Sequence, residues 1–229
     1  CIRDRISNNN QLPKSVKPII KGKRRINGMI DFESLLFNID INSERIPRSG
    51  SLLVAEPFLR EQYFHHSVIC LVDYEPRGSA MGVVLNNITS YTLQDLVSSV
   101  KVKTPIPIFC GGPMSCDRLY FVHTLGDVIP DARKINDTLS IGGDFDVLLS
   151  IINDGYDTEG TVRFFIGYSG WSPGQLDEEL LKKVWAVTDI RDNHSLLKGA
   201  EDAYWHRVVR GMGAEFRGWL YHPRNPHSN

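Results

Sequence analysis

Residues 167–171, Gly-Tyr-Ser-Gly-Trp, are the part of this chain whose residue types most resemble catalytic machinery. Ser169 lies between two glycines after an apolar run, the setting in which a nucleophilic serine is held on a turn between a strand and a helix. Such an elbow needs glycine at its fifth position, where this chain has Trp171. His123, His194 and His206 are candidate bases for Ser169, and sequence alone leaves such a triad open. We expect Ser169 to be a structural residue of a turn.

The residues after this serine have the pattern of a helix start. With Ser172 as the N-cap, Pro173 takes the first helical position and Gln175 completes a capping box. Trp171 and Leu176 then occupy the two positions of a hydrophobic staple. Because these residues have structural tasks at this spacing, the pattern predicts a helix that begins at Pro173 rather than an active site.

A second candidate is Cys110-Gly111-Gly112, which follows a short apolar run. Paired glycines can expose backbone N–H groups to an anion, but this stretch lacks the Lys-Ser/Thr of a phosphate-binding loop. Its composition favours a tight turn. Cys110 is a candidate reactive thiol, although a buried and inert cysteine is the commoner case. Cys116 follows at a spacing wider than that of usual zinc sites.

Both glycine turns follow predicted strands, so they could lie at one edge of a sheet and form a site between them. The ligand-binding candidates are Gly111, Gly112, Gly167, Ser169 and Trp171.

Metal and cofactor binding are not indicated by the sequence. The adjacent His65 and His66 point to opposite faces of an extended chain, so they cannot easily share one metal ion. None of the usual metal-binding or dinucleotide-binding patterns occurs. We therefore expect neither a metal site nor a cofactor.

Composition limits the classes of partner. The 229 residues carry 26 basic and 27 acidic side chains, which gives no global reason to expect nucleic acid. The longest apolar runs are far shorter than the roughly 20 residues that cross a bilayer, so no membrane partner is expected. The polar N-terminus has no apolar region typical of a secretory signal, which makes the cytoplasm the expected location.

The chain divides by composition into four parts. Residues 1–28 are rich in Asn and basic residues and predict a disordered leader, whose place in the natural protein stays open. Residues 29–49 predict a short helix over 30–39 and a linker. Residues 50–215 form the single domain, and 216–229 predict a flexible tail rich in Pro, Asn and His.

Within the domain, hydrophobic periodicity and turn residues predict strands and helices in an order that begins with hairpins. The expected strands are 51–58, 67–74, 80–86, 106–110, 118–125, 137–141 and 161–168, and the expected helices are 91–100, 145–154, the one from Pro173, and 200–213. Because strands and helices do not alternate strictly, the order favours an α+β fold with a mixed, curved sheet.

Three blocks in this order and spacing resemble the bacterial YqgE/AlgH family. They are GSLLVAEPFLREQYFHHSVICLVDYEPRGSAMGVVLN (50–86), IFCGGPMSCDRLYFVHTL (108–125) and FFIGYSGWSPGQLDEELLKKVWAV (164–187). The resemblance implies a sheet folded into a pseudo-barrel with flanking helices, in a cytoplasmic bacterial protein. It implies no known reaction, and the family is commonly labelled a transcriptional regulator. The family also admits Ala at the position of Ser169, and Cys is not usual at the position of Cys110.

Two functions follow as hypotheses. The first is a non-enzymatic binding or regulatory module, because caps, turns and packing account for the conspicuous motifs. The alternative is a hydrolase or thiol-dependent enzyme with a site between the Gly111-Gly112 and Gly167–Trp171 turns. The partner stays open between another protein, a second copy of the chain and, with weaker support, nucleic acid.

Overall fold

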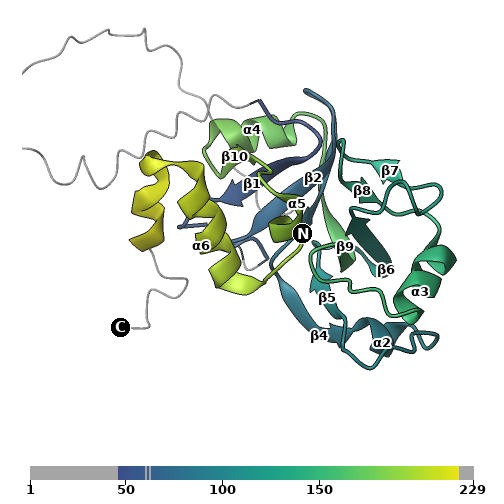
Figure 1. Cartoon of the computed structure of the whole chain (residues 1–229). Coiled ribbons are helices and arrows are strands. Elements are labelled where there is room, and N and C mark those ends of the chain that lie inside the picture. The colour runs from purple at the N-terminus through teal and green to yellow at the C-terminus, as the bar shows by residue number, and fades with distance from the viewer. Residues whose placement is uncertain (1–45, 60, 62, 222–229) are drawn as a thin grey trace, which may run out of the picture. The chain divides into compact units, whose positions relative to one another are not determined.

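The computed structural model describes residues 46–59, 61 and 63–221 (Figure 1). The predicted leader 1–28, the helix predicted over 30–39 and the end of the predicted tail from 222 lie outside the described residues. Ten strands belong to the described part of the chain: β1 (Ser51–Ala55), β2 (Val68–Tyr74), β3 (Ala80–Val84), β4 (Ile88–Thr92), β5 (Pro107–Cys110), β6 (Met114–His123), β7 (Arg133–Lys134), β8 (Ser140–Ile141), β9 (Val162–Trp171) and β10 (Trp185–Asp189). The helices there are α2 (Leu93–Leu96), α3 (Phe145–Asn153), α4 (Gln175–Leu181), α5 (Asn193–Leu196), α6 (Glu201–Met212) and the 3₁₀ helix η2 (Ala214–Tyr221).

The strands form one curled sheet in the order β10-β1-β2-β3-β9-β6-β8-β7, with β5 paired to β9 and β4 paired to β5. All pairs are antiparallel except β5 with β9, which is parallel. The sheet curls into a half-barrel with helices around it, so the expected α+β fold with a mixed, curved sheet is confirmed.

Apolar side chains cover both faces of the first strands. All five residues of β1 are buried, and α6 packs against β1 and β2 (Figure 1). The alternate residues Leu53 and Ala55 belong to a core cluster that also contains Trp171 and Leu176, next to α4. A second core cluster joins α3 to the sheet and includes Leu148 of α3 and Phe164 of β9. These strands could be predicted because a strand that is buried on both faces has a continuous apolar sequence.

Helix α4 begins two residues later than predicted. Its N-cap is Gly174 in the left-handed region rather than Ser172, because β9 continues as a strand through Trp171. The Gln175 side chain still accepts the Ser172 N–H at 3.1 Å, as a capping box requires. The residues predicted as a turn over 167–171 are therefore part of β9, and the last three of them pair with β3.

One carboxylate fixes α4 to the sheet. Glu179 Oε2 accepts the indole N–H of Trp171 at 2.8 Å and that of Trp185 at 2.7 Å. Both indoles are buried and stand edge to face, with ring centroids 6.4 Å apart. Glu179 thereby links α4, β9 and β10, so the apolar Trp171–Leu176 contact predicted from sequence is reinforced by a polar one that was not predicted.

The chain crosses over strand β9 at Gly167. Strands β3 and β5 follow one edge of β9, whereas β6 runs along the other edge, so residues 111–113 pass from one edge to the other. A Cβ on Gly112 would lie 2.3 Å from the Tyr168 carbonyl carbon, and a Cβ on Gly111 would lie 2.3 Å from the Gly167 oxygen. A Cβ on Gly167 would lie 2.5 Å from the Gly112 oxygen. Only glycines permit two backbones to approach so closely.

Four short elements were not predicted, namely β4, β7, α5 and η2, and one predicted helix is too long. The polar strand β4 and the helix α5 lack a clear hydrophobic period, and the helix predicted over 91–100 is confined to α2. The 3₁₀ helix η2 was not predicted because Phe216 and Trp219 stand in a polar, glycine-containing segment. Both side chains are buried in the structure, so the predicted flexible tail does not begin at 216.

Replacing Gly112 tests the crossing. We expect Gly112→Ala to lower the free energy of unfolding by more than about 4 kcal/mol, because the added methyl group meets backbone atoms that cannot move aside. The matched control is Gly174→Ala, which has a positive φ of 76° but open space around its Cβ. Its expected cost is roughly 1 kcal/mol, from the backbone conformation alone. Urea unfolding measures both, and equal losses would contradict the crossing.

Candidate functional site

The hydroxyl of Ser169 is hydrogen-bonded to the segment that crosses β9. The side chain is 1% exposed, and its Oγ donates to the Gly111 carbonyl oxygen at 3.1 Å. The same oxygen accepts the Val84 N–H at 2.9 Å. Ser169 therefore joins the crossing segment to β9, and its oxygen does not face a solvent-accessible cleft.

His123 lies far from this serine. It pairs with Val162 at the opposite end of β9, seven residues from Ser169, which is roughly 23 Å along a strand. Its Nδ1 accepts the Leu125 N–H at 3.1 Å, and its Nε2 bonds the Gly142 carbonyl at 2.9 Å. Burial lowers the pKa of His123 despite the Gly142 bond, so the neutral ring is favoured. The structure does not bring this base to either candidate nucleophile.

The two thiols near the crossing share one acceptor. Cys110 Sγ lies 3.8 Å and Cys116 Sγ 3.6 Å from the Gly112 carbonyl oxygen. Burial raises the pKa of the Cys110 thiol, with a smaller opposing effect from the Gly112 bond. Because the thiolate is the reactive form, this shift disfavours Cys110 as a nucleophile.

The five ligand-binding candidates are brought together but leave no space between them. Gly111, Gly112 and Gly167 are in backbone contact, and Trp171 points into the core. An open depression of about 320 Å³ lies beside the glycines; of the five candidates Trp171 lines it, together with Met81, Met114, Tyr168, Gly170 and neighbouring residues. It contains one carboxylate, Asp73, which pairs with Arg133 at 3.0 Å. This depression offers apolar contact but no uncompensated charge.

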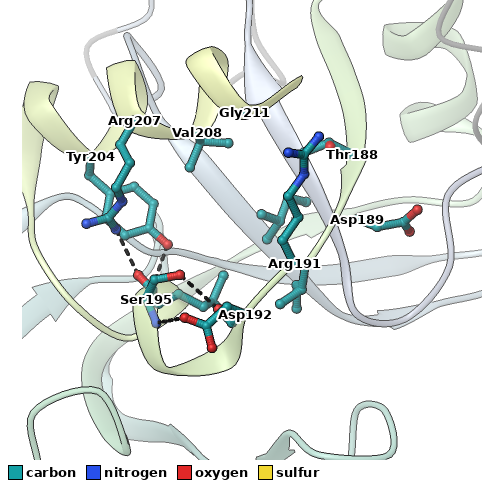
Figure 2. Close-up of a pocket in the computed structure, with 12 residues that line it drawn as sticks. Thr188, Asp189, Arg191, Asp192, Ser195, Tyr204, Arg207, Val208 and Gly211 are labelled. Carbon is teal, nitrogen blue, oxygen red and sulfur yellow. Dashed lines mark hydrogen bonds between the residues drawn. The ribbon is translucent and has the colours of Figure 1, made fainter. Parts of the chain in front are cut away.

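A more closely defined cavity of about 200 Å³ lies between the end of β10, α5 and α6 (Figure 2). We call it the α6 cavity; its lining residues are Leu52, Thr188, Asp189, Ile190, Arg191, Asp192, Ser195, Leu196, Tyr204, Arg207, Val208 and Gly211. Aliphatic and aromatic groups form most of its surface, and charged groups stand at its rim. An apolar space with a few polar groups is the usual form of a small-molecule site.

Each element contributes to the α6 cavity for a local reason. Asp192 is the N-cap of α5 and accepts the N–H groups of His194 and Ser195, which fixes the turn after β10. Tyr204 is buried, and its hydroxyl donates to the Leu196 carbonyl at 2.7 Å. Gly211 lies in the last turn of α6, and a Cβ there would meet only Arg191 Nη1, at 3.9 Å. The cavity thus exists partly because Gly211 has no side chain.

Guanidinium groups surround Tyr204. Arg207 Cζ lies 4.5 Å and Arg163 Cζ 5.7 Å from the centre of its ring. Arg163 is 4% exposed and donates to the carbonyls of Leu85 and Gly199, while Arg207 donates to those of Ser195 and Lys198. Burial, opposed by Tyr204 and assisted by Arg207, lowers the pKa of Arg163 to about 10, so it stays charged at neutral pH.

These arginines have no carboxylate partner within the described residues. The acceptors of Arg163 and Arg207 are neutral carbonyls, and Arg191 forms no ion pair or hydrogen bond with any described residue. The two carboxylates of the cavity are engaged elsewhere: Asp189 binds Arg48 at 3.1 Å, and Asp192 caps α5. Positive charge next to the cavity is therefore not compensated by the protein.

Helix α6 is anchored at its first turn by an aromatic stack. The His66 ring lies 4.1 Å from the Trp205 ring and 4.4 Å from the His65 ring, nearly parallel to both. His66 Nδ1 bonds Asp202 Oδ1 at 2.5 Å, and Trp205 donates to the Ala55 carbonyl at 3.0 Å. The two histidines were expected on opposite faces of an extended chain, but residues 63–66 form a turn that stacks them.

No group of three or more His, Cys, Asp or Glu within the described residues could hold a metal ion. Helices long and apolar enough to cross a membrane are also absent from that part of the chain.

Comparison with known proteins identifies the family. Residues 52–217 match the family described as AlgH-like. A UPF0301 protein of Parabacteroides distasonis is 41% identical over 195 residues, covering 85% of this chain and 97% of its own. The chain belongs to the AlgH-like family. A UPF0301 protein of Bacteroides thetaiotaomicron is 34% identical over 200 residues, covering 87% of this chain and the whole relative.

Solved AlgH-like structures have the same fold. The solution structure of the AlgH protein from Pseudomonas aeruginosa superposes with a TM-score of 0.57 at 25% identity, covering 72% of this chain and 89% of that one. A crystal structure of a Corynebacterium diphtheriae protein gives a TM-score of 0.60 at 22% identity, covering 78% and 93%. These relatives support the resemblance inferred from the three sequence blocks.

Sequence analysis missed the residues of the α6 cavity. Arg191 and Arg207 line it from the turn before α5 and from α6, Arg163 of β9 lies next to Tyr204, and no spacing or motif connects the three. The nearest signal was Gly211 inside an otherwise good helix pattern, since a glycine there costs helix stability and suggests a packing or functional reason.

The lowered pKa values of two buried histidines, His66 and His123, predict that the protein loses stability in acid. Burial lowers the pKa of His66, with Asp202 opposing and His65 and His206 adding to the shift, and it lowers the pKa of His123. For a histidine whose pKa in the folded protein lies below the unfolded value of 6.5, the contribution to folding stability is complete above pH 6.5. This contribution is lost as the pH falls through the pKa of the folded protein.

We therefore expect the urea midpoint of the protein to fall as the pH is lowered from about 7.5 to about 5. His66→Asn, whose side chain tolerates the positive φ of 49° at this position, should flatten this dependence. The control Phe64→Leu removes core contacts without changing titration, so it should lower the midpoint equally at every pH. An unchanged slope in His66→Asn would show that His66 does not titrate in this range.

Proposed function

We propose that this AlgH-like protein is a non-enzymatic binding protein that acts as a regulatory module, with the α6 cavity as its ligand site. The observation that carries the proposal is the contrast between two places. At the glycine crossing, the polar atoms that could do chemistry are bonded to backbone carbonyls. At the α6 cavity, an open space lies next to the guanidinium of Arg191, which has no bonded partner in the part of the chain that the structure describes.

The geometry does not favour the alternative, a hydrolase or thiol-dependent enzyme. Ser169 is buried with its hydroxyl bonded to the Gly111 carbonyl, and the raised pKa of Cys110 keeps its thiol protonated. General base catalysis requires a base within hydrogen-bond reach of the nucleophile, directly or through one water. His123 is too far along β9 to meet this condition.

The regulatory part of the proposal draws on the family resemblance, as does a cytoplasmic location. A bound ligand would contact both α6 and the turn before α5, so it would stabilise their relative position. A ligand that binds only the folded state raises stability by mass action. Such a change in α6 is the kind of signal that a partner protein can recognise. Residues 49–229 carry 16 basic and 22 acidic side chains, so nucleic acid is the less supported partner.

A cavity-filling variant tests the binding site. Gly211→Leu places a side chain in the α6 cavity and removes a glycine from α6, which should raise the melting temperature. We expect small apolar molecules, screened by ligand-observed NMR, to bind the wild-type chain and to lose binding in this variant. Leu181→Ala, an exposed position on α4, is the control and should leave binding unchanged. Binding that persists in Gly211→Leu would remove the α6 cavity as the site.

A second test addresses the enzymatic alternative. We expect Ser169→Ala to cost about 1 kcal/mol of stability, the net value of one buried hydrogen bond. It should leave the hydrolysis of an activated ester at the background rate shown by the wild-type chain. Ester turnover by the wild-type chain that disappears in Ser169→Ala would establish a hydrolase and refute the non-enzymatic proposal.

A further inference from the structure

The α6 cavity also indicates the chemistry of its ligand, an inference that rests on the proposed function. Its volume of about 200 Å³ is somewhat larger than the roughly 150 Å³ in which a benzene molecule is known to bind in an engineered protein cavity. A molecule of about ten non-hydrogen atoms therefore fits. Because aliphatic and aromatic groups form most of the wall, the body of this molecule must be apolar.

The charge at the cavity determines the polar end of the ligand. Arg191 and Arg207 lie on opposite sides of the cavity, with Val208 and Gly211 of α6 between them (Figure 2). The guanidinium of Arg191 has no bonded partner among the described residues and lies within contact distance of the space at Gly211. A guanidinium presents donors in a planar fork that matches a carboxylate.

The buried Arg163 makes an anion more favourable still. Its charge is held by two carbonyl groups and by the faces of Phe109, at 4.2 Å, and Tyr204. Removing a cation from water without a carboxylate partner is costly, and the positive charge of Arg207 repels that of Arg163. An anion in the cavity would be attracted by all three arginines, weakly screened from the buried Arg163 and partly screened by water from the exposed Arg191 and Arg207.

The carboxylates at the rim do not cancel this field. Asp189 is paired with Arg48, and Asp192 is bonded to the first turn of α5. The nearby Lys198 is itself balanced by Glu159 at 3.4 Å. With Asp189 paired, Arg191 and Arg207 face the single charge of Asp192, so the net charge at the cavity is positive.

We propose that the α6 cavity binds a small monocarboxylate with a compact apolar body, whose carboxylate pairs with Arg191 and whose body packs against Leu52, Tyr204 and Val208. An aryl or branched aliphatic carboxylic acid belongs to this class. The anionic end reaches the rim, and the apolar end replaces water that the walls bind poorly.

The test compares benzoate with benzamide, which has nearly the same shape and no charge. Titration followed by amide shifts of the full chain should show benzoate binding at least tenfold more tightly than benzamide, with shifts at Val208 and Gly211. Acetate, which lacks the body, and inorganic phosphate, which lacks the apolar part, should each bind at least tenfold more weakly than benzoate.

Two variants assign the charge recognition to this site. Arg191→Gln should reduce benzoate affinity about tenfold, which corresponds to about 1.4 kcal/mol, and should leave benzamide affinity unchanged. Arg210→Gln removes an exposed cation of the same helix that does not line the cavity, so it should leave both affinities unchanged. Gly211→Leu should abolish binding of both probes while the melting temperature rises.

The outcomes separate this inference from the proposed function. Equal affinity for benzoate and benzamide, with both blocked by Gly211→Leu, overturns the carboxylate assignment and leaves the cavity as a binding site. Benzoate binding that Gly211→Leu does not block overturns both. No benzoate binding at about 10 mM, or equal losses of benzoate affinity in Arg191→Gln and Arg210→Gln, also overturns the carboxylate assignment.

Discussion

The passage of one backbone over another at Gly167 is the constraint on which the rest of this fold depends. Strand β9 needs β3 and β5 on one edge and β6 on the other, and the chain can supply both only by crossing β9 between β5 and β6. Van der Waals radii leave no room for a Cβ at the crossing, so Gly111, Gly112 and Gly167 are required together. The hydroxyl of Ser169 then bonds the crossing segment and holds it in place. This arrangement closes the sheet into its half-barrel.

The crossing also explains why a motif that resembles a nucleophile elbow has a structural role. A serine between glycines after a strand is what a nucleophile elbow requires, but it is equally what a close backbone crossing requires. The two cases differ in where the hydroxyl points and in what lies beside it. Here it points to the Gly111 carbonyl, and the candidate base His123 lies on β6, opposite the far end of β9. Chemistry at this position would need the bond that stabilises the fold to be broken.

Helix α6 connects the two other polar features of the molecule. Its first turn is fixed by the stack of His66 on Trp205 and by Asp202, and its last turn forms one wall of the α6 cavity through Gly211. A ligand in the cavity and the protonation of His66 would therefore act on the same helix from opposite ends. The buried charge of Arg163, compensated only by carbonyls and rings in the described structure, supplies a reason for the cavity to accept an anion.

The sequence by itself determined the fold class, most of the buried strands, the helices α3 and α6, and the membership of the AlgH-like family. These follow from local signals: continuous apolar runs, helical periodicity, capping residues such as Asp144, and glycines at fixed spacing. Only the tertiary structure decided what those glycines do and where recognition groups gather. Gly112 and Gly167 are 55 positions apart, and their contact is created by strand register rather than by any local pattern. Arg191 and Arg207 line the same cavity from separate elements, and the buried Arg163 lies behind Tyr204. Burial and charge compensation are properties of the packed molecule, which no window of sequence contains.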